Sequence, residues 1–151
     1  TDSLGTRVLR EAIATHYRDH YGLDVPADRI AVTTGSSAAF NLAFLAMFDA
    51  GDRVAIAAPG YPAYRNIMAA LGLEVVEIEL DGAPFLAARH LLTAHAEKPL
   101  KGVLFASPAN PTGAVVPGPD LAEALECGRR AVFADSHLPL QVLLFVPISG
   151  L

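Results

Sequence analysis

The sequence has little of what marks secreted, nucleic-acid-binding or membrane proteins. Cys127 is its one cysteine, so no internal disulfide can form, and a reducing, cytoplasmic location is expected. The net charge is −5 and no basic run occurs, which argues against a nucleic-acid partner. The polar start TDSLGTRVLREA is unlike a signal peptide. The apolar stretch 138–151 is too short to cross a bilayer and is broken by Pro139 and Pro147, so no membrane partner is expected.

Three common site motifs are also missing. Without G-x-G-x-x-G the chain is unlike a dinucleotide-binding α/β domain, and without G-x-S-x-G it is unlike a serine hydrolase of the α/β type. His16 and His20 have the i, i+4 spacing of metal ligands. Tyr17, however, stands where the glutamate of HExxH would be, and histidines at the edge of a helix stripe are the favoured interpretation. No metal site is predicted.

The chain does have enough apolar residues to form one domain with a packed core. Hydrophobic residues make up 52% and charged residues 18% of 151 residues, which excludes a disordered chain. The first predicted element is a helix over Thr6–Gly22 that ends at a glycine. Its expected buried stripe is Leu9, Ile13, Tyr17 and Tyr21, with Arg7, Arg10, Arg18 and Asp19 toward the other side.

Apolar runs bounded by turn residues predict the strands of a mostly parallel sheet. Two of the runs are almost wholly apolar, which is typical of strands with both faces covered by helices. A third alternates apolar and acidic residues, as expected at a sheet edge. The predicted strands are Ile30–Thr34, Val54–Ala58, Glu74–Leu80 and Val103–Ala106, and Ala131–Asp135 and Gln141–Val146 are further candidates. The predicted fold class is therefore α/β.

A candidate anion site follows the first predicted strand. Gly35 allows a sharp turn and close approach of a ligand, and Ser36, Ser37 and Ala38 open an alanine-rich helix with small side chains. The N-terminus of a helix directs unpaired N–H groups and the positive end of the macrodipole at such a site, which suits phosphate. An ordinary strand-to-helix turn with a serine N-cap would have the same sequence pattern, and the two interpretations are about equally supported.

Two further candidate residues follow apolar strands directly. Tyr61 lies in PGYPAY after Val54–Ala58, and Asn110 is held between prolines in SPANPTG after Val103–Ala106. In a parallel sheet, ligands lie beyond the carboxyl ends of the strands, so both are expected on the same side as Ser36. The tyrosine could stack on a flat heteroaromatic ring, or simply pack. The asparagine could bond a ring oxygen, or bond its own backbone.

Three segments in this order resemble the class I/II aminotransferases, which use pyridoxal 5′-phosphate. The segments are TTGSSAAF, GDRVAIAAPGYPAYRNI and ASPANPTG, and an LREAIATHY helix precedes them. The resemblance implies the three-layer α/β sandwich of the fold-type-I large domain. It implies that Gly35, Ser36, Ser37 and Ala38 bind the cofactor phosphate and that Tyr61 stacks on the pyridine ring. Asn110 would bond the phenolic oxygen, and Asp135 would pair with the ring nitrogen.

The sequence also departs from the family pattern. Where the family has Asp-Glu-x-Tyr, this chain has Asp135-Ser136-His137-Leu138, and the match decays after Cys127. Residues 1–127 are thus expected to be part of an aminotransferase large domain, and residues 128–151 a divergent end. The only lysines, Lys98 and Lys101, precede the fourth predicted strand, whereas the family's Schiff-base lysine follows the aspartate, so that lysine is absent here. The family's carboxylate-binding arginine, near its C-terminus, is also absent. No catalytic residue is therefore assigned.

The resemblance implies a role in amino acid metabolism. The parent reaction would transfer an amino group between an amino acid and a 2-oxo acid in a homodimer, and the chain would be inactive by itself. The alternatives are a non-catalytic remnant or interaction module, or a relative of the pyridoxal-phosphate-dependent C–S lyases, which share these motifs.

Overall fold

The computed structural model describes residues 2–79, 98, 100–119 and 142–147. In chain order its elements are α1 (Arg7–Tyr21), the short 3₁₀ helix η1 (Ala27–Arg29), α2 (Ser36–Met47), β1 (Arg53–Ala58), α3 (Pro62–Ala70), β2 (Glu74–Glu79), β3 (Gly102–Ser107) and β4 (Val142–Pro147). Backbone contacts divide the chain into two compact units, Thr1–Ala39 and Phe40–Leu151.

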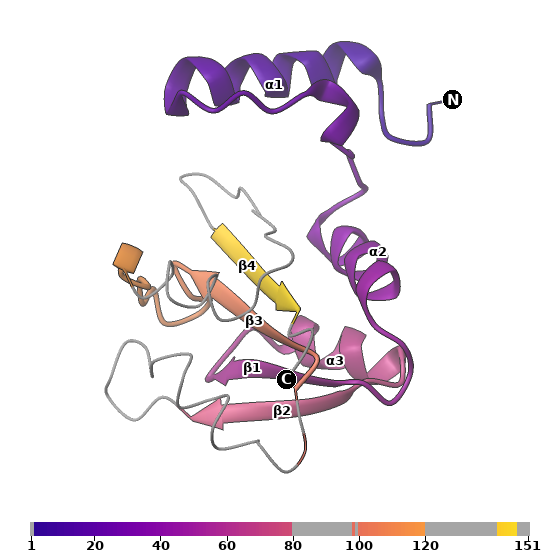
Figure 1. The fold of residues 1–151 in the computed structure, drawn as a ribbon, viewed down its shortest axis with the longest axis vertical. Helices are drawn as coiled ribbons and strands as arrows, with labels where there is room; N and C mark the ends of the chain where they lie inside the picture. The colour runs from indigo at the N-terminus through magenta and orange to yellow at the C-terminus, as the bar shows by residue number, and fades with distance from the viewer. Residues whose placement is uncertain (1, 80–97, 99, 120–141, 148–151) are drawn as a thin grey trace. The chain divides into compact units, whose positions relative to one another are not determined.

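The second unit is built on a sheet with strand order β2-β1-β3-β4 (Figure 1). β1 pairs in parallel with β2 and with β3, which confirms the predicted α/β class with a mostly parallel sheet. β2, with its alternating acidic residues, is an edge strand in this order, as predicted. The candidate strand Gln141–Val146 corresponds to β4, which pairs with β3 in the antiparallel sense.

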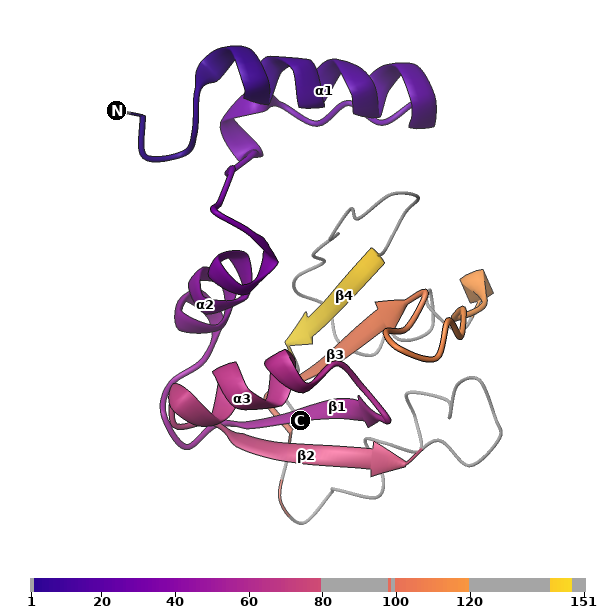
Figure 2. The same cartoon turned by 180° about the vertical axis from the view of Figure 1, so that it is seen from behind.

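The apolar sequence of β1 and β3 is explained by their burial. Val54, Ala55 and Ile56 in β1 and Val103, Leu104 and Phe105 in β3 are all buried, because central strands of a parallel sheet have both faces covered. Helix α3 covers one face (Figure 2). It begins with Pro62 at its first position, where the missing N–H costs nothing.

Three phenylalanines spaced four residues apart, two on α2 and one just after it, join this core. Phe40 and Phe44 on α2 and Phe48 beyond its last residue are buried, whereas Leu42 and Leu45 on α2 are 60% and 64% exposed. The cluster also takes in residues of α3, β1 and β3. Its members are Phe40, Phe44, Phe48, Val54, Ile56, Tyr64, Met68, Leu73 and Leu104. The tightest positions are Phe44 and Met68, whose side chains are 1% and 0% exposed.

The first unit differs from the prediction in two respects. Residues 30–34 form no strand; within the part of the chain that the structure describes, their backbone bond to a distant segment is the one from the Val32 N–H to the Leu4 carbonyl at 2.9 Å. A β-branched sequence favours extended backbone, but only a partner strand makes a ladder. The predicted strand Ile30–Thr34 is therefore wrong as an element of the sheet.

The buried face of α1 matches the predicted stripe only in part: Ile13 and Tyr17 are half-buried as expected, but the two ends of the stripe are not. Arg10 and Ala14 are buried, whereas Leu9 and Tyr21 are 46% and 42% exposed. Arg10 was expected on the outer side, and this is wrong because its guanidinium finds enough hydrogen-bond acceptors to be stable away from water. The helix otherwise ends as predicted, with Gly22 in the left-handed conformation at φ 65°.

Several predictions fall outside the described residues. These are the candidate strand Ala131–Asp135 with its aspartate, and the departure from the family pattern at residues 136–138. The boundary at residue 127 between the family-like part and a divergent end also stays a prediction.

Candidate cofactor site

The turn at Gly35 has the backbone geometry that an anion needs for close approach. Gly35 has φ +128°, which L-residues with a side chain rarely adopt, and a Cβ placed there would meet no atom within 4 Å. Its carbonyl accepts from the Ala39 N–H at 3.3 Å and from the Thr33 hydroxyl at 2.8 Å. Because the first α2 bond reaches back to Gly35, the N–H groups at positions 36–38 belong to the turn that lacks intrahelical acceptors.

Exposure agrees with an open approach to this turn. Thr34, Gly35 and Ser37 are exposed, and Ser36 and Ala38 are half-buried. The residues present therefore fit a phosphate group: a glycine leaves the space empty, the side chains are small, and a 12-residue helix begins at the same point. This fit supports the role that the sequence assigned to Gly35, Ser36, Ser37 and Ala38, which stays a prediction.

Tyr61 is held at the end of β1 with its ring partly free. It is the N-cap residue of α3, and the residue as a whole is 39% exposed. The rings of Tyr61 and Tyr64 meet edge-on, with centroids 5.4 Å apart, and Tyr64 in turn meets Phe40 edge-on at 5.0 Å. Since Tyr64 is buried, it supports the Tyr61 ring from the core side. A supported, partly exposed aromatic ring suits stacking against a planar ligand.

Asn110 lies at the tip of a loop that is closed by hydrogen bonds. The Ala109 N–H donates to the Ala114 carbonyl at 2.7 Å, and the Gly113 N–H donates to the Ala109 carbonyl at 2.6 Å. Closer to the sheet, the Ser107 hydroxyl accepts from the Val116 N–H at 3.0 Å. Asn110 itself is half-buried. The loop thus presents one amide side chain from a fixed backbone.

The sheet register places the segments of Tyr61 and Asn110 at the same end of the parallel strands. β1 and β3 are parallel neighbours, with Val54 opposite Gly102 and Ile56 opposite Leu104. Tyr61 follows the last residue of β1 by three positions, and Asn110 follows the last residue of β3 by three. Both segments therefore leave the carboxyl ends of adjacent parallel strands, the position where ligands bind in open α/β sheets.

The predicted site residues do not all belong to the same unit of the structure. Gly35 to Ala38 belong to the first unit and Tyr61 and Asn110 to the second. Asp135 lies outside the described residues. Two buried polar residues, Arg10 and Ser107, were not singled out by the sequence. The burial of a single polar residue produces no periodic pattern of apolar residues in the sequence. Arg10 does, however, lie four residues before the buried Ala14 on α1.

The described residues contain neither a cluster of metal-binding side chains nor a helix that could span a membrane. The rings of His16 and His20 are tilted by 31° to each other with centroids 4.2 Å apart, and the Nδ1 of His20 lies 3.2 Å from the His16 carbonyl oxygen. Over the described ranges there is no group of three or more histidine, cysteine, aspartate or glutamate side chains that could hold a metal ion. Within that same part of the chain, no helix is long and apolar enough to cross a membrane.

Comparison with known proteins gives consistent matches. The family model for aminotransferase class I and II matches residues 1–135. The chain is 53% identical over 120 residues to valine–pyruvate aminotransferase of Mycobacterium tuberculosis, covering 80% of this chain and 31% of that protein. It is 36% identical over 116 residues to (5-formylfuran-3-yl)methyl phosphate transaminase of Methanocaldococcus jannaschii, covering 77% and 30%.

Solved structures agree with the sequence matches. A crystal structure of an aminotransferase from Mycobacterium tuberculosis has a TM-score of 0.77 and 52% identity, covering 83% of this chain and 33% of that one. A putative aminotransferase from Silicibacter pomeroyi has a TM-score of 0.73 and 41% identity, with the same coverages. The chain thus spans about a third of the length of these relatives. The extent of the family match shows that the chain belongs to the class I and II aminotransferases.

Proposed function

We propose that this chain binds pyridoxal 5′-phosphate and contributes most of the cofactor site of an aminotransferase. The observation that supports this most is the parallel register of β1 and β3, because it brings the Tyr61 and Asn110 segments to the same edge of the sheet. Bound there, pyridoxal 5′-phosphate supplies an electron sink for charge at the α-carbon of an amino acid.

Each candidate residue has a distinct task in this proposal. The backbone N–H groups and hydroxyls of Gly35, Ser36, Ser37 and Ala38 bind the phosphate. Tyr61 holds the ring plane by stacking, and the Asn110 amide donates a hydrogen bond to the phenolic oxygen. The Asp135 carboxylate accepts a hydrogen bond from the protonated ring nitrogen and so favours the cationic form of the ring.

The two lysines of the chain are unsuited to covalent attachment of the cofactor. The Lys101 N–H donates to the carbonyl of Arg53, the first residue of β1, at 2.8 Å, and the Arg53 guanidinium donates to the Lys98 carbonyl. Both lysines therefore lie at the amino-terminal edge of β1 and β3. A six-residue strand spans about 17 Å at roughly 3.3 Å per residue. The opposite edge, where Tyr61 and Asn110 lie, is out of reach.

The proposed reaction is the transfer of an amino group. The substrates are an amino acid and a 2-oxo acid, with valine and pyruvate as the first pair to test because of the mycobacterial relative. Amino-group transfer needs a Schiff-base lysine and a carboxylate-binding arginine, and neither role is assigned to a residue of this chain. The expected assembly is a homodimer, as in the family. We expect no transamination from this chain by itself.

The test is a binding titration with a matched pair of tyrosines. Tyr61→Ala should weaken binding of pyridoxal 5′-phosphate, by about tenfold for the loss of a stacking contact and the area it buries. Tyr21→Ala should not, although Tyr21 is equally exposed at 42% against 39%. Asn110→Ala should also weaken binding, with Val115→Ala in the same loop as its control. Equal effects of Tyr61→Ala and Tyr21→Ala, or no saturable binding to the unmodified chain, would refute the proposal.

A further inference from the structure

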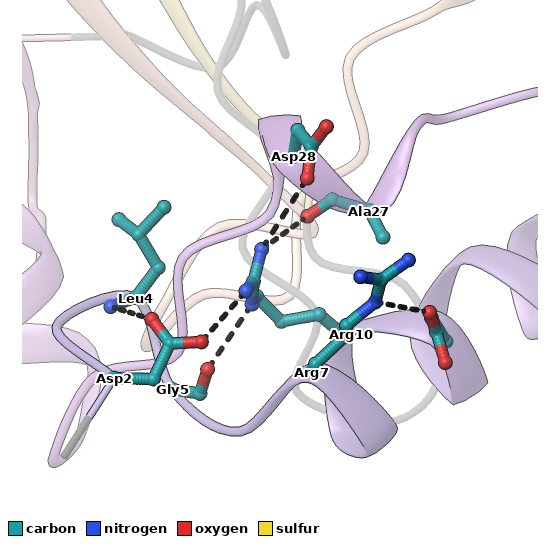
Figure 3. Close-up of polar contacts among 8 residues, drawn as sticks. Asp2, Leu4, Gly5, Arg7, Arg10, Ala27 and Asp28 are labelled. Carbon is teal, nitrogen blue, oxygen red and sulfur yellow. Dashed lines mark hydrogen bonds and ion pairs between the residues drawn. The ribbon is translucent and has the colours of Figure 1, made fainter.

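Arg10 is a buried charge that connects three segments of the first unit. Its side chain is 8% exposed. The Nε donates to the Gly5 carbonyl at 3.1 Å, Nη1 donates to the Ala27 carbonyl at 3.0 Å, and Nη2 donates to the Asp2 carboxylate at 2.9 Å (Figure 3). Burying a guanidinium is costly unless its donors are satisfied, so a network of this kind defines one geometry. Arg10 thereby ties α1 to the turn before it and to η1.

The turn that Arg10 holds is closed on itself. The Gly5 N–H donates to the Asp2 carbonyl at 3.1 Å, and the Leu4 N–H donates to the Asp2 carboxylate at 3.2 Å. Asp2 therefore accepts from both Leu4 and Arg10, and Gly5 both donates within the turn and accepts from Arg10. The position of the Leu4 and Gly5 backbone depends on the guanidinium.

This turn packs directly on Val32. The Leu4 carbonyl accepts from the Val32 N–H at 2.9 Å. A Cβ added to Gly5, which has φ +88°, would lie 2.7 Å from the Val32 Cβ, so the two backbones approach as closely as only glycine allows. Val32 is thus held by a hydrogen bond on its backbone and by a contact on its side chain.

Val32 leads straight into the turn that carries Gly35. The Thr33 hydroxyl bonds the Gly35 carbonyl at 2.8 Å, and α2 begins at Ser36. Residues 30–34 have no strand ladder to fix them, so the contacts of Val32 with Leu4 and Gly5 take the place of one. Every contact in this series lies within the first unit.

We propose that Arg10 is a positioning residue that sets the geometry of the phosphate-binding turn Gly35–Ala38 through Leu4, Gly5 and Val32. The inference rests on the proposed function of that turn. It predicts a phosphate-specific effect, because the network reaches the turn and none of its residues is assigned to the ring of the cofactor.

The test compares two arginines of the same helix. Arg10→Met removes the donors and keeps an unbranched side chain, and Arg7→Met removes an equal charge whose ion pair with Glu11 is exposed, at 81% for the arginine. Dissociation constants are measured for pyridoxal 5′-phosphate and for pyridoxal, which lacks the phosphate. We expect Arg10→Met to weaken pyridoxal 5′-phosphate binding by about tenfold or more and to leave pyridoxal binding unchanged. Arg7→Met should change neither.

Milder variants keep the test decisive if Arg10→Met does not fold. Arg10→Lys keeps the charge with fewer donors in place, and Asp2→Ala removes one partner of the guanidinium. Each should give a smaller loss in the same phosphate-specific direction. Hydrogen exchange at the amides of residues 32–36 should accelerate in both, and not in Arg7→Met.

The outcomes separate this inference from the function on which it rests. If the unmodified chain prefers pyridoxal 5′-phosphate over pyridoxal and the Arg10 and Asp2 variants keep that preference, the inference is overturned and the proposed function stands. An equal loss for both ligands also overturns it, since that would be a general effect on folding. If the unmodified chain shows no preference for the phosphate ester, the proposed function fails and the inference fails with it.

Discussion

The hydroxyl of Ser107, the last residue of β3, accepts a hydrogen bond from the backbone N–H of Val116 at 3.0 Å. This bond joins the two ends of the loop that carries Asn110, and Ser107 is only 9% exposed. A polar group at the root of a loop can thus control the position of an amide at its tip. The bond is the starting point for the first prediction.

Ser107→Ala should loosen the loop and destabilise the protein. The substitution leaves the Val116 N–H without its acceptor, which costs about 1–3 kcal/mol when the group is shielded from water. Thr112→Ala is the matched control, because the Thr112 hydroxyl accepts from the Ala114 N–H at 3.3 Å in an exposed position. Its loss should cost no more than about 0.5 kcal/mol. Urea unfolding of both variants measures the difference, and similar midpoints would contradict the assigned role of Ser107.

Gly5→Ala should be much more damaging than Gly22→Ala. Both glycines have positive φ, +88° and +65°, so an alanine at either costs roughly 1–2 kcal/mol of backbone strain. Only at Gly5 does the new methyl group overlap another residue, at 2.7 Å from the Val32 Cβ, which adds about 1–3 kcal/mol of overpacking. Thermal unfolding followed by circular dichroism compares the two. Equal losses would show that the turn can move away from Val32 without cost.

Phe44→Ala should remove a large part of the stability of the second unit. Phe44 is 1% exposed in the core cluster and stacks on Phe40 at a centroid distance of 5.8 Å. Truncating a buried phenylalanine costs about 3–5 kcal/mol, from lost transfer energy and the cavity left behind. The neighbouring Leu45→Ala should change the unfolding free energy by less than about 0.5 kcal/mol, because Leu45 is 64% exposed. A large effect of Leu45→Ala in chemical denaturation would mean that this side of α2 is covered in solution.

Asp2 should titrate at an unusually low pH. Hydrogen bonds from the Leu4 N–H, first, and from the Arg10 guanidinium hold the pKa of its carboxyl below the ordinary value. A carboxyl whose folded-state pKa is lowered contributes stability above its unfolded-state pKa, and that contribution is lost as the pH falls through the folded-state pKa. A carboxyl-detected NMR titration should therefore place the Asp2 midpoint below that of an unstructured aspartate.

The Arg10 variants refine this pH prediction. In Arg10→Met the pKa of Asp2 should rise, but it should stay below the ordinary value because the Leu4 N–H still donates. Arg7→Met should leave the midpoint unchanged. An Asp2 midpoint that does not respond to Arg10→Met would show that the ion pair of Figure 3 is not formed in solution.

Much of the sheet could be predicted from the sequence because its strands differ in how they meet water. The wholly apolar runs at β1 and β3 predicted buried parallel strands, and the alternating acidic run at β2 predicted an edge strand; among the strands that the structure describes, both predictions are confirmed. Pro62, close after β1, stands at the first position of α3, where proline is favoured by its own local geometry. These are local properties of the chain, which the side chains express whatever their neighbours are.

Other features depended on partners far along the chain. The β-branched run at residues 30–34 looks like a strand, but only the fold determines whether a ladder forms, and Val32 bonds Leu4 instead. The run at β4 was a candidate strand whose antiparallel pairing with β3 no local pattern encodes.

By itself, then, the sequence determined which segments are apolar, where they turn, and which motifs follow the strands. Only the tertiary structure decided that Arg10 is buried, because its acceptors on Asp2, Gly5 and Ala27 are up to 17 residues away. The physical reason is that periodicity reports the preference of a side chain for water, whereas the cost of burying a charge is set by the groups that surround it.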